Sequence, residues 1–342
     1  MAQAYVTETG SGGSGPDRQG SRLRRLADGW RGDPGIWRRG IVTAAVAVLL
    51  TLVMLFHAQI PNGIGNLGSL IETFLPWLGV LIPVLFVIGV VRKSATALIA
   101  VLLPAVIWAG SFGGLITTKS SGAGRGDLTV ATHNVNAENA DPAGTARDVA
   151  ASGADVVALE ELTADAVPTY EKALAGTYKY HSVQGTVGLW SKYPLTGTKP
   201  VDIKLGWTRA MRTTVNSPKG EVAVYVAHLP SVRVKLDAGF TANQRDASAD
   251  ALGEAIADEQ VSKVVLLGDL NGTMNDRALN AVTSQLRSTQ GAAGDGFGFS
   301  WPASFPMARI DQIMVKGVEP VSSWTLPETG SDHLPIAARV EL

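Results

Sequence analysis

Groups of polar residues in the second half of the chain stand at the ends of short apolar runs, and their chemistry suits metal-assisted phosphate hydrolysis. The candidates are Asn134, Asn136, Glu160, Glu161, His228, Asp269, Asn271, Arg309, Asp311, Asp332 and His333. Carboxylate oxygens suit Mg²⁺ or Mn²⁺, which are hard cations. A His held by a carboxylate can take a proton from water, and an Asn amide can donate to a phosphoryl oxygen as charge develops. Polar groups at strand ends converge on a rim, where ligand sites usually form.

Each candidate alone also suits a structural role. An Asp or Asn after a strand is a common turn former, and a single His is usually structural or exposed. Glu160 and Glu161 together could begin a solvated helix. The combination of acid, amide and His groups, each beside an apolar run, favours an active site. The chain has no Cys, which excludes a Cys nucleophile, thiolate metal sites and a disulfide scaffold.

The apolar runs that carry these groups predict an α/β domain over residues 127–342. Strands are predicted at Leu128–Val135, Asp155–Leu159, Val187–Ser191, Arg209–Asn216, Glu221–His228, Lys263–Gly268, Arg309–Val315 and Leu334–Val340. Helices are predicted at Pro142–Ser152, Ala164–Ala175 and Thr241–Glu259. Some strands follow one another directly, which favours stacked mixed sheets with outer helices over a pure βαβ wind. The glycine-rich segment Gly291–Gly298 predicts a mobile loop, because it does not join a strand to a helix as a phosphate cradle would.

The order and spacing of these motifs resemble the endonuclease/exonuclease/phosphatase superfamily. The matching blocks are Thr132–Asn136, Val157–Glu161, Gly188–Leu195, Ala227–Pro230, Gly268–Asn271, Arg309–Ile313 and Ser331–His333. The last three blocks in this order are quite specific, whereas any one alone is weak. The resemblance implies a two-sheet, four-layer α/β sandwich that cleaves phosphoester bonds with a divalent metal, Mg²⁺ or Mn²⁺.

The resemblance also implies roles for the residues that match its motifs. Glu161 matches the metal-binding Glu, and Asn134 matches the Asn beside the metal. His333 matches the general base that takes a proton from the attacking water, and Asp311 matches the carboxylate that orients this His. Asp269 and Asn271 match the pair that positions the nucleophile and stabilises the phosphoryl oxygens.

Other matched positions have a role in only some members, a supporting role, or a residue that departs from the family pattern. His228 matches a second catalytic His of several members, while Arg309 and Asp332 are assigned only supporting roles. Glu160 replaces the commoner Gln before the metal-binding Glu. Asn136 stands where some members have an acid, which would make any contact there weaker or water-mediated.

The first 126 residues predict a membrane anchor. Residues 1–39 form a basic, disordered tail with seven Arg, and residues 40–117 hold three apolar segments, Ile41–Ile60, Leu70–Val91 and Ala95–Ile116. Buried core helices are the alternative, which three such segments in close succession disfavour. Residues 118–126 predict a short flexible linker.

The placement of Lys and Arg predicts the orientation of this anchor. The tail is rich in Arg, the first loop (57–69) has no Lys or Arg, and the second loop carries Arg92 and Lys93. This pattern places the N-terminus in the cytoplasm and the domain from residue 127 outside the cytoplasmic membrane. Three such helices before this kind of domain resemble the VanJ-type membrane proteins of actinomycetes, which are associated with resistance to teicoplanin-class glycopeptide antibiotics.

The leading functional hypothesis is hydrolysis of a lipid-linked phosphate or pyrophosphate, with undecaprenyl pyrophosphate as the candidate. An extracellular nuclease is the alternative, but residues 127–342 carry a net charge of −7, which disfavours nucleic acid as a partner. A local basic patch, formed by Arg209, Arg212, Arg233, Lys235 and Arg245, could bind a polyanion or clamp a pyrophosphate. A phospholipase or sphingomyelinase-type phosphodiesterase also remains open, whereas the intact set of acids and His argues against a non-catalytic sensor.

Overall fold

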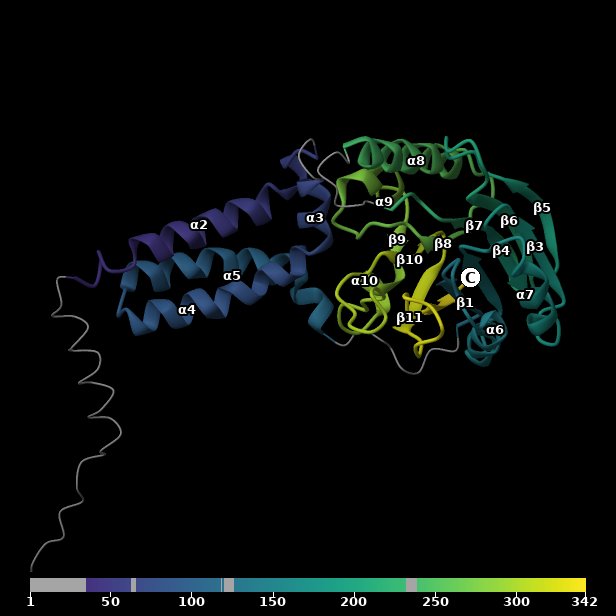
Figure 1. Ribbon diagram of the computed structural model, residues 1–342, viewed down its shortest axis with the longest axis horizontal. Helices are drawn as coiled ribbons and strands as arrows, with labels where there is room; N and C mark the ends of the chain where they lie inside the picture. The colour runs from purple at the N-terminus through teal and green to yellow at the C-terminus, as the bar shows by residue number, and fades with distance from the viewer. Residues whose placement is uncertain (1–34, 63–65, 118, 120–125, 232–238) are drawn as a thin grey trace, which may run out of the picture.

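The computed structural model describes residues 35–62, 66–117, 119, 126–231 and 239–342. The predicted tail (1–39) and linker (118–126) therefore lie mostly outside the described residues, as do Arg233 and Lys235. The described chain has two parts, a helical arm and an α/β sandwich at its end (Figure 1).

Two six-stranded sheets stack face to face in the sandwich. The first sheet has the order β11 (Glu319–Thr325), β12 (Ile336–Glu341), β1 (Leu128–Asn134), β2 (Val156–Glu160), β4 (Val187–Ser191) and β3 (Tyr180–Gln184). The second has the order β5 (Leu195–Pro200), β6 (Ala210–Ser217), β7 (Gly220–Ala227), β8 (Val264–Asp269), β10 (Asp311–Lys316) and β9 (Arg287–Ser288). The buried side chains between them include Val130, Leu189, Val224 and Leu267.

Helices cover the outer face of each sheet. The first sheet packs on α6 (Pro142–Ala151) and α7 (Val167–Leu174), and the second on α8 (Gly239–Ala257) and α9 (Asn280–Thr283). Short helices η3 (Arg277–Leu279) and α10 (Thr289–Ala293) complete this part. The predicted two-sheet, four-layer α/β sandwich is confirmed. Asp141 caps α6 by accepting a hydrogen bond from Gly144 N at 2.8 Å, and Pro142 occupies its first position.

Four strands were not expected from the sequence, namely β3, β5, β9 and β11. Strand β5 exposes four of its six residues, and β9 has only two residues. These strands lie at or next to sheet edges, where one side faces solvent and no continuous apolar run is needed.

The sheet topology brings the candidate residues to one end of the sandwich. Strands β1 and β2 are parallel, as are β7 and β8, so their carboxyl ends point the same way. Strands β10 and β12 are antiparallel to β8 and β1, so the amino ends of β10 and β12 reach the same rim. The pair Asn134 and Glu160 and the pair Asp269 and Asp311 are register partners there.

The arm is a bundle of apolar helices, although it differs from three full membrane spans. It consists of α2 (Ile41–Leu55), η1 (His57–Gln59), α3 (Leu67–Thr73), η2 (Leu75–Val80), α4 (Leu81–Val91) and α5 (Ala95–Ile116). Among the helices in the described part of the chain, only α5 is long and apolar enough to cross a membrane by itself. Its 22 residues span about 33 Å, whereas the 15 residues of α2 span about 22 Å.

The second predicted span is bent by 71° between Leu67–Thr73 and Leu75–Val91. The bend lies next to Pro76, the second residue of the 3₁₀ segment η2, which has no N–H group to continue the hydrogen bonding of α3. The prediction of three regular membrane helices is therefore not confirmed: the described arm holds one such helix, or two if the bent pair is counted as a span.

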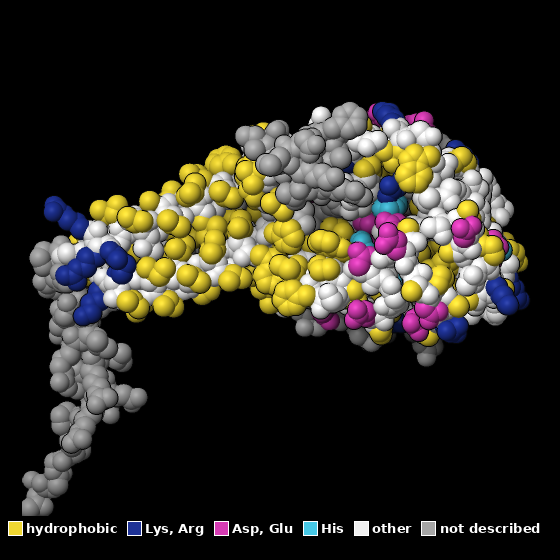
Figure 2. Space-filling model, in the orientation of Figure 1, with side chains coloured by type: hydrophobic (Ala, Val, Ile, Leu, Met, Phe, Trp, Pro, Cys, Tyr) yellow, Lys and Arg dark blue, Asp and Glu magenta, His cyan; other side chains and the backbone are white. Residues whose placement is uncertain are grey.

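Apolar side chains cover the outside of the arm (Figure 2). Exposed large residues on α2, α4 and α5 include Val42, Leu49, Leu52, Val84, Phe86, Val87, Leu102, Leu103 and Val106. Arg38, Arg39, Arg92 and Lys93 are exposed where α2 begins and α4 ends, at the tip of the arm far from the sandwich (Figure 2).

The arm is docked on the sandwich by specific contacts. The Arg277 guanidinium donates to the carbonyls of Ala58 and Ile60 at 2.7 and 2.6 Å. Trp77 Nε1 donates to Met307 O at 2.8 Å. The sandwich is therefore held against the arm by direct contacts.

The glycine-rich segment Gly291–Gly298 differs from the predicted mobile loop because part of it packs against the arm. Phe297 contacts the rings of Trp108 and Phe112 at centroid distances of 6.4 and 6.2 Å. The neighbouring Phe299 stacks on Trp77 at 5.8 Å. Aromatic packing thus joins this loop to the helices.

Candidate active site

Unusual backbone conformations mark the rim of the sandwich. Asn136, Glu161 and Asn271 each have a positive φ, between 47° and 60°. Such conformations are uncommon for residues other than Gly and cluster at functional sites. At Gly268, with φ 145°, a Cβ would lie 1.9 Å from Ala227 O, so only glycine allows β8 to approach β7 before Asp269.

His333 and Asp311 form a buried pair. His333 Nδ1 lies 2.9 Å from Asp311 Oδ2 and 3.2 Å from Asp311 Oδ1. The hydroxyl of Ser300 donates to Asp311 Oδ2 at 2.6 Å, which fixes the carboxylate from the other side. Because Asp311 holds Nδ1, the Nε2 atom is directed to the cleft, where it lies 3.9 Å from Asp269 Oδ2.

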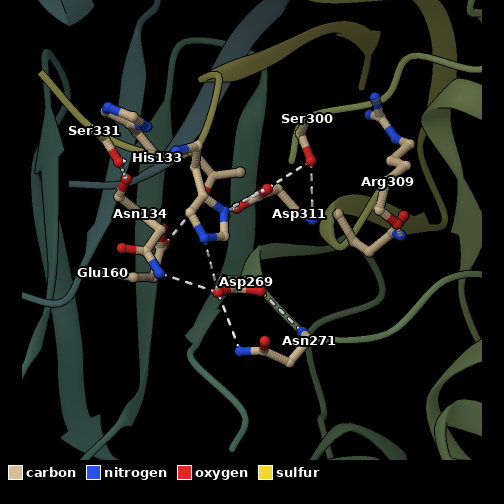
Figure 3. Close-up of polar contacts among 12 residues, drawn as sticks. His133, Asn134, Glu160, Asp269, Asn271, Ser300, Arg309, Asp311 and Ser331 are labelled. Carbon is tan, nitrogen blue, oxygen red and sulfur yellow. Dashed lines mark hydrogen bonds and ion pairs between the residues drawn. The ribbon is translucent and has the colours of Figure 1, made fainter. Parts of the chain in front are cut away.

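Asp269 lies at the centre of a group of amide donors (Figure 3). Its Oδ2 accepts hydrogen bonds from Asn134 Nδ2 at 3.0 Å and Asn271 Nδ2 at 3.1 Å. Its Oδ1 accepts from the backbone N–H of Asn271 at 2.8 Å. These donors stabilise a carboxylate that is only 1% exposed.

The electrostatics of this site favour a proton on His333 when no cation is bound. Burial alone would lower the pKa of His333, but the charge and hydrogen bond of Asp311, with Asp269, raise it to about 10. Burial raises the pKa of Asp311, and His333 overcomes this effect and holds it below its usual range. Burial and the nearby Asp311 raise the pKa of Asp269 to about 7, against the opposing charge of His333.

The donor set suits a hard divalent cation. Asp269, Asp311 and His333 each offer a ligand atom within 4.8 Å of the others, and all are buried. Asp311 and His333 already bind one another, which leaves Asp269 and the half-exposed Glu161 as carboxylate donors to the cleft. His228 Nε2 links these two, at 3.6 Å from Glu161 Oε1 and 3.6 Å from Asp269 Oδ2. Two carboxylates and an amide are the oxygen donors that Mg²⁺ or Mn²⁺ prefers.

His228 is a neutral group in this environment. Burial, together with the charges of Arg209 and His333, holds the pKa of His228 well below its usual range. Its Nδ1 has no hydrogen-bond partner within the described part of the chain. A neutral imidazole keeps one N–H group, and at Nε2, beside Glu161 and Asp269, this group can donate to a bound phosphate.

The predicted basic patch is not formed as expected. Arg209 lines the cleft, and its guanidinium lies 5.0 Å from the ring centroid of Trp207. Arg212 instead binds Glu259 through two hydrogen bonds of 2.8 and 2.9 Å, so its assignment to substrate binding is wrong. Side chains alternate along a strand, and Arg212 in β6 faces the helical layer with Tyr225 and Glu259.

Arg245, from the same predicted patch, is also occupied elsewhere. Its side chain is fully buried and forms an ion pair of 2.7 Å with Asp276. It also donates to Asn271 O at 3.0 Å. Arg245 therefore supports the loop after β8 and does not present its charge to a substrate.

Of the four remaining candidates, only Asp332 lines the cleft. Glu160 is buried below the rim, where it accepts a hydrogen bond from Thr132 at 2.8 Å, and burial raises its pKa well above the usual range. The Asn136 side chain accepts from Glu138 N and does not line the cleft. Arg309 is buried and donates to Gly298 O at 2.7 Å, whereas Asp332 is exposed and lines the cleft.

Three contributors to the site were not named as candidates from the sequence. Ser300 follows the glycine-rich loop and holds Asp311. Ser331 donates to Asn134 O at 2.7 Å and accepts from His333 N at 3.1 Å, so it joins two rim segments. His133 is buried beside them, with Nε2 2.9 Å from Thr329 Oγ1. Ser331 and His133 lie inside recognised motifs, but Ser300 does not.

A cleft of about 910 Å³ opens at this rim. Its floor includes Glu161, His228, Asp269, Asn271 and His333. One wall comes from the arm, through Ser69, Leu70, Thr73 and Phe74 of the α3 region. The reactive groups and the apolar arm thus share one cavity.

A two-sheet α/β sandwich with carboxylates, amides and a His–Asp pair at one rim defines a class of enzymes that hydrolyse phosphoester bonds with a divalent metal. The chain belongs to the Endonuclease/Exonuclease/phosphatase family, whose family model matches residues 131–333. No curated protein sequence matches the chain significantly.

Solved structures share the fold at low sequence identity. Beta toxin from Staphylococcus aureus is 15% identical with a TM-score of 0.52, over 62% of this chain and 99% of that one. The mannosyl-6-phosphatase Bt3783 of Bacteroides thetaiotaomicron is 16% identical with a TM-score of 0.52, over 63% and 100%. TDP2 of D. rerio, complexed with a single-strand DNA product, is 17% identical with a TM-score of 0.53, over 63% and 99%. All three alignments leave more than a third of this chain unmatched.

Proposed function

We propose that this protein is a membrane-anchored phosphohydrolase that acts on a lipid-linked phosphate or pyrophosphate at the outer face of the cytoplasmic membrane. Undecaprenyl pyrophosphate is the candidate substrate. The observation that carries the proposal is the shared cavity, in which α3 of the apolar arm forms a wall of the cleft that holds Asp269 and His333. A phosphate attached to a lipid can reach such a site without leaving the membrane surface.

The surface of the arm supports membrane insertion. Only 22% of the apolar window of α5 is buried, whereas a core helix of a globular domain is mostly covered. The cations at the tip, Arg38, Arg39, Arg92 and Lys93, fit the cytoplasmic side, because Lys and Arg are retained there. The sandwich then lies on the outer side, at the opposite end of the arm.

We infer a mechanism from the geometry of the pair His333 and Asp311. Asp311 holds Nδ1, and His333 would lose its extra proton once a bound divalent cation neutralises the carboxylates that raise its pKa. The Nε2 of the neutral ring can then accept a proton from a water that attacks phosphorus, while the bond from phosphorus to the leaving-group oxygen breaks. Asp269 accepts a hydrogen bond from this water and so positions it, and the amide of Asn271 is the proposed donor to a phosphoryl oxygen. His228, in its neutral form, and the charged Arg209 lie near Asp269. Both bind phosphate oxygens as negative charge develops on the phosphoryl group.

Glu161 and Asn134 are the proposed metal-binding residues. The Oε2 atom of Glu161 accepts from Ala137 N at 3.0 Å, which leaves Oε1 available on the cleft side. Asn134 Oδ1 accepts from Asn136 N at 3.0 Å and retains a second lone pair. When bound, Mg²⁺ or Mn²⁺ would neutralise charge on the phosphoryl group and hold the nucleophile close to it.

A phosphate-release assay on the purified protein tests the proposed substrate. With Mg²⁺ or Mn²⁺ present, a polyprenyl pyrophosphate should be hydrolysed faster than a phospholipid or plasmid DNA. Faster nicking of DNA would favour the nuclease alternative, despite the acidic charge of the domain. Release of a headgroup from intact phospholipid would favour a phosphodiesterase.

We further propose a role in glycopeptide resistance of the teicoplanin type. The support is the resemblance of the chain order, apolar N-terminal segments before this domain, to the VanJ-type proteins. Deletion of the gene in its host should lower the inhibitory concentration of teicoplanin, and the wild-type chain should restore it. An unchanged concentration would remove this part of the proposal.

A further inference from the structure

Helix α3 is fixed beside the loop that follows β8 by buried polar contacts. Arg245 Nη2 donates to Ser69 Oγ at 3.1 Å, and the same guanidinium donates to Asn271 O at 3.0 Å. Thr273 Oγ1 donates to Glu72 O at 3.2 Å. The buried side chain of Arg245 therefore links α3 to Asn271, two residues after Asp269 at the rim.

Two of the four residues by which the α3 region lines the cleft have apolar side chains, one within α3 and one directly after it. Leu70 and Phe74 are half-buried and line the cavity. Across the cavity, Leu162, Ile310 and Trp301 provide further apolar surface. A polar floor with apolar walls is suited to a ligand that joins a phosphate to a hydrocarbon.

The cleft is larger than a phosphate group alone would fill. At about 910 Å³, the cavity lies near the upper end of the range for small-molecule sites. Beyond Phe74, the chain continues through η2 into α4, which exposes Val84, Phe86 and Val87. Apolar surface therefore extends along the chain from the cleft wall to the arm.

We propose that α3 is the part of the active site that binds the hydrocarbon chain next to the scissile phosphate, with Leu70 and Phe74 as specificity-determining residues. This inference rests on the proposed function and names the substrate feature that the site recognises. Burial of a substrate chain against these side chains stabilises the complex by the hydrophobic effect. Affinity should therefore rise with the length of the isoprenoid chain.

The test measures kcat/KM for pyrophosphates with C5, C15 and C55 isoprenoid chains in one detergent. In the wild-type protein this ratio should increase with chain length. Leu70→Ala and Phe74→Ala should each reduce the C55 value by about tenfold and leave the C5 value within about twofold. Leu67→Ala is the matched control, because Leu67 lies on the same helix, is 46% exposed and does not line the cleft.

The outcomes separate the two proposals. If both variants keep the wild-type dependence on chain length, or lose activity equally on all chains with an unchanged Tm, α3 does not bind the hydrocarbon. If a variant has a lowered Tm, Phe74→Leu or Leu70→Val repeats the comparison with less change in packing. If the wild-type protein releases phosphate from none of these chains, the proposed function itself is wrong.

Discussion

At the scale of single residues, the contacts of His333 decide which chemistry is available. Its Nδ1 is held by Asp311, and its Nε2 is directed to the part of the cleft where Asp269 lies. A general base needs this arrangement, because the orienting carboxylate fixes both the tautomer and the ring. The His–Asp pairing came from motif resemblance, and the structure places the two side chains in contact.

His333→Ala should lower turnover at least roughly a hundredfold while the domain still folds, since general base catalysis contributes about 10²–10⁴-fold. Asp311→Asn should also reduce turnover, because an amide cannot stabilise the charged imidazole in the same way. The control is His181→Ala, since His181 is exposed and pairs with Glu171 at 3.1 Å. Near-normal activity of His333→Ala, measured as initial phosphate release, would show that another group is the base.

The same pair predicts a pH dependence of stability in the metal-free protein. The pKa of His333 is raised from its ordinary value near 6.5 to about 10 in the folded state. The resulting stabilisation is complete below pH 6.5 and is lost as the pH rises towards 10. The pKa of Asp269, at about 7, lies at the lower end of this range, so its own contribution changes little above pH 7.

The Tm of EDTA-treated protein should therefore fall between pH 7.5 and 10. In His333→Asn the curve should be flatter over the same range, because the titrating group is gone. An equal slope in both proteins would show that His333 is not protonated in the folded state. Thermal unfolding followed by circular dichroism is sufficient for this comparison.

At the scale of elements, most of the rim was predictable because buried strands leave a strong sequence pattern. The run 264–268 has no polar side chain and is followed by Asp269, so both the strand and its functional end are visible in the sequence. Strand β5 was missed because four of its six residues are exposed and it contains Thr, Gly and Lys, so it shows no apolar pattern. The role of α3 was missed because hydropathy marks it as one end of a straight span and gives no sign of its 71° bend.

The loop that contains Phe297, Phe299 and Ser300 shows the same limit. Its glycines suggest mobility, yet its aromatic residues pack on the arm, and Ser300 is bonded on three sides. Ser300 N donates to Ala308 O at 2.9 Å, Ser300 O accepts from Leu334 N at 2.7 Å, and Ser300 Oγ donates to Asp311. Tertiary contacts, which local patterns do not encode, fix this element.

Ser300→Ala should lower kcat by about tenfold with little change in KM. The reason is that a hydrogen bond to a charged group contributes about 1.5–3 kcal/mol, and here it fixes the carboxylate that orients His333. Ser217→Ala is the control, because Ser217 Oγ bonds only within its own turn, donating to Gly220 O at 2.8 Å and accepting from Lys219 N at 3.2 Å. A change in KM alone would place the effect of Ser300 in substrate binding instead.

At the scale of the whole molecule, the arm and the sandwich are joined through polar and aromatic contacts near the cleft. Arg277 binds carbonyls of the arm on one side, and Trp77 stacks on Phe299 on the other. These contacts hold the rim at a fixed position relative to the apolar bundle. The proposed orientation in the membrane therefore also determines where the cleft opens.

A pair of reporter fusions tests this orientation. Alkaline phosphatase attached after Leu342 should be active, because the proposed orientation places β12 and the C-terminus that follows it outside the membrane. A cytoplasmic reporter at the same position should be inactive. The reverse pattern would place the cleft in the cytoplasm and would remove the argument for a substrate of the outer leaflet.

The central claim, a metal-dependent phosphohydrolase with an arm-lined active site, is tested most directly by metal depletion and restoration on one substrate. Phosphate release from undecaprenyl pyrophosphate is measured with the full-length protein, first with EDTA and then with excess Mg²⁺ or Mn²⁺. Activity should be lost with EDTA and return with the metal in the wild-type protein, but not in Glu161→Ala or Asp269→Ala. Hydrolysis that persists in EDTA, or that returns equally in Glu161→Ala, would contradict the account.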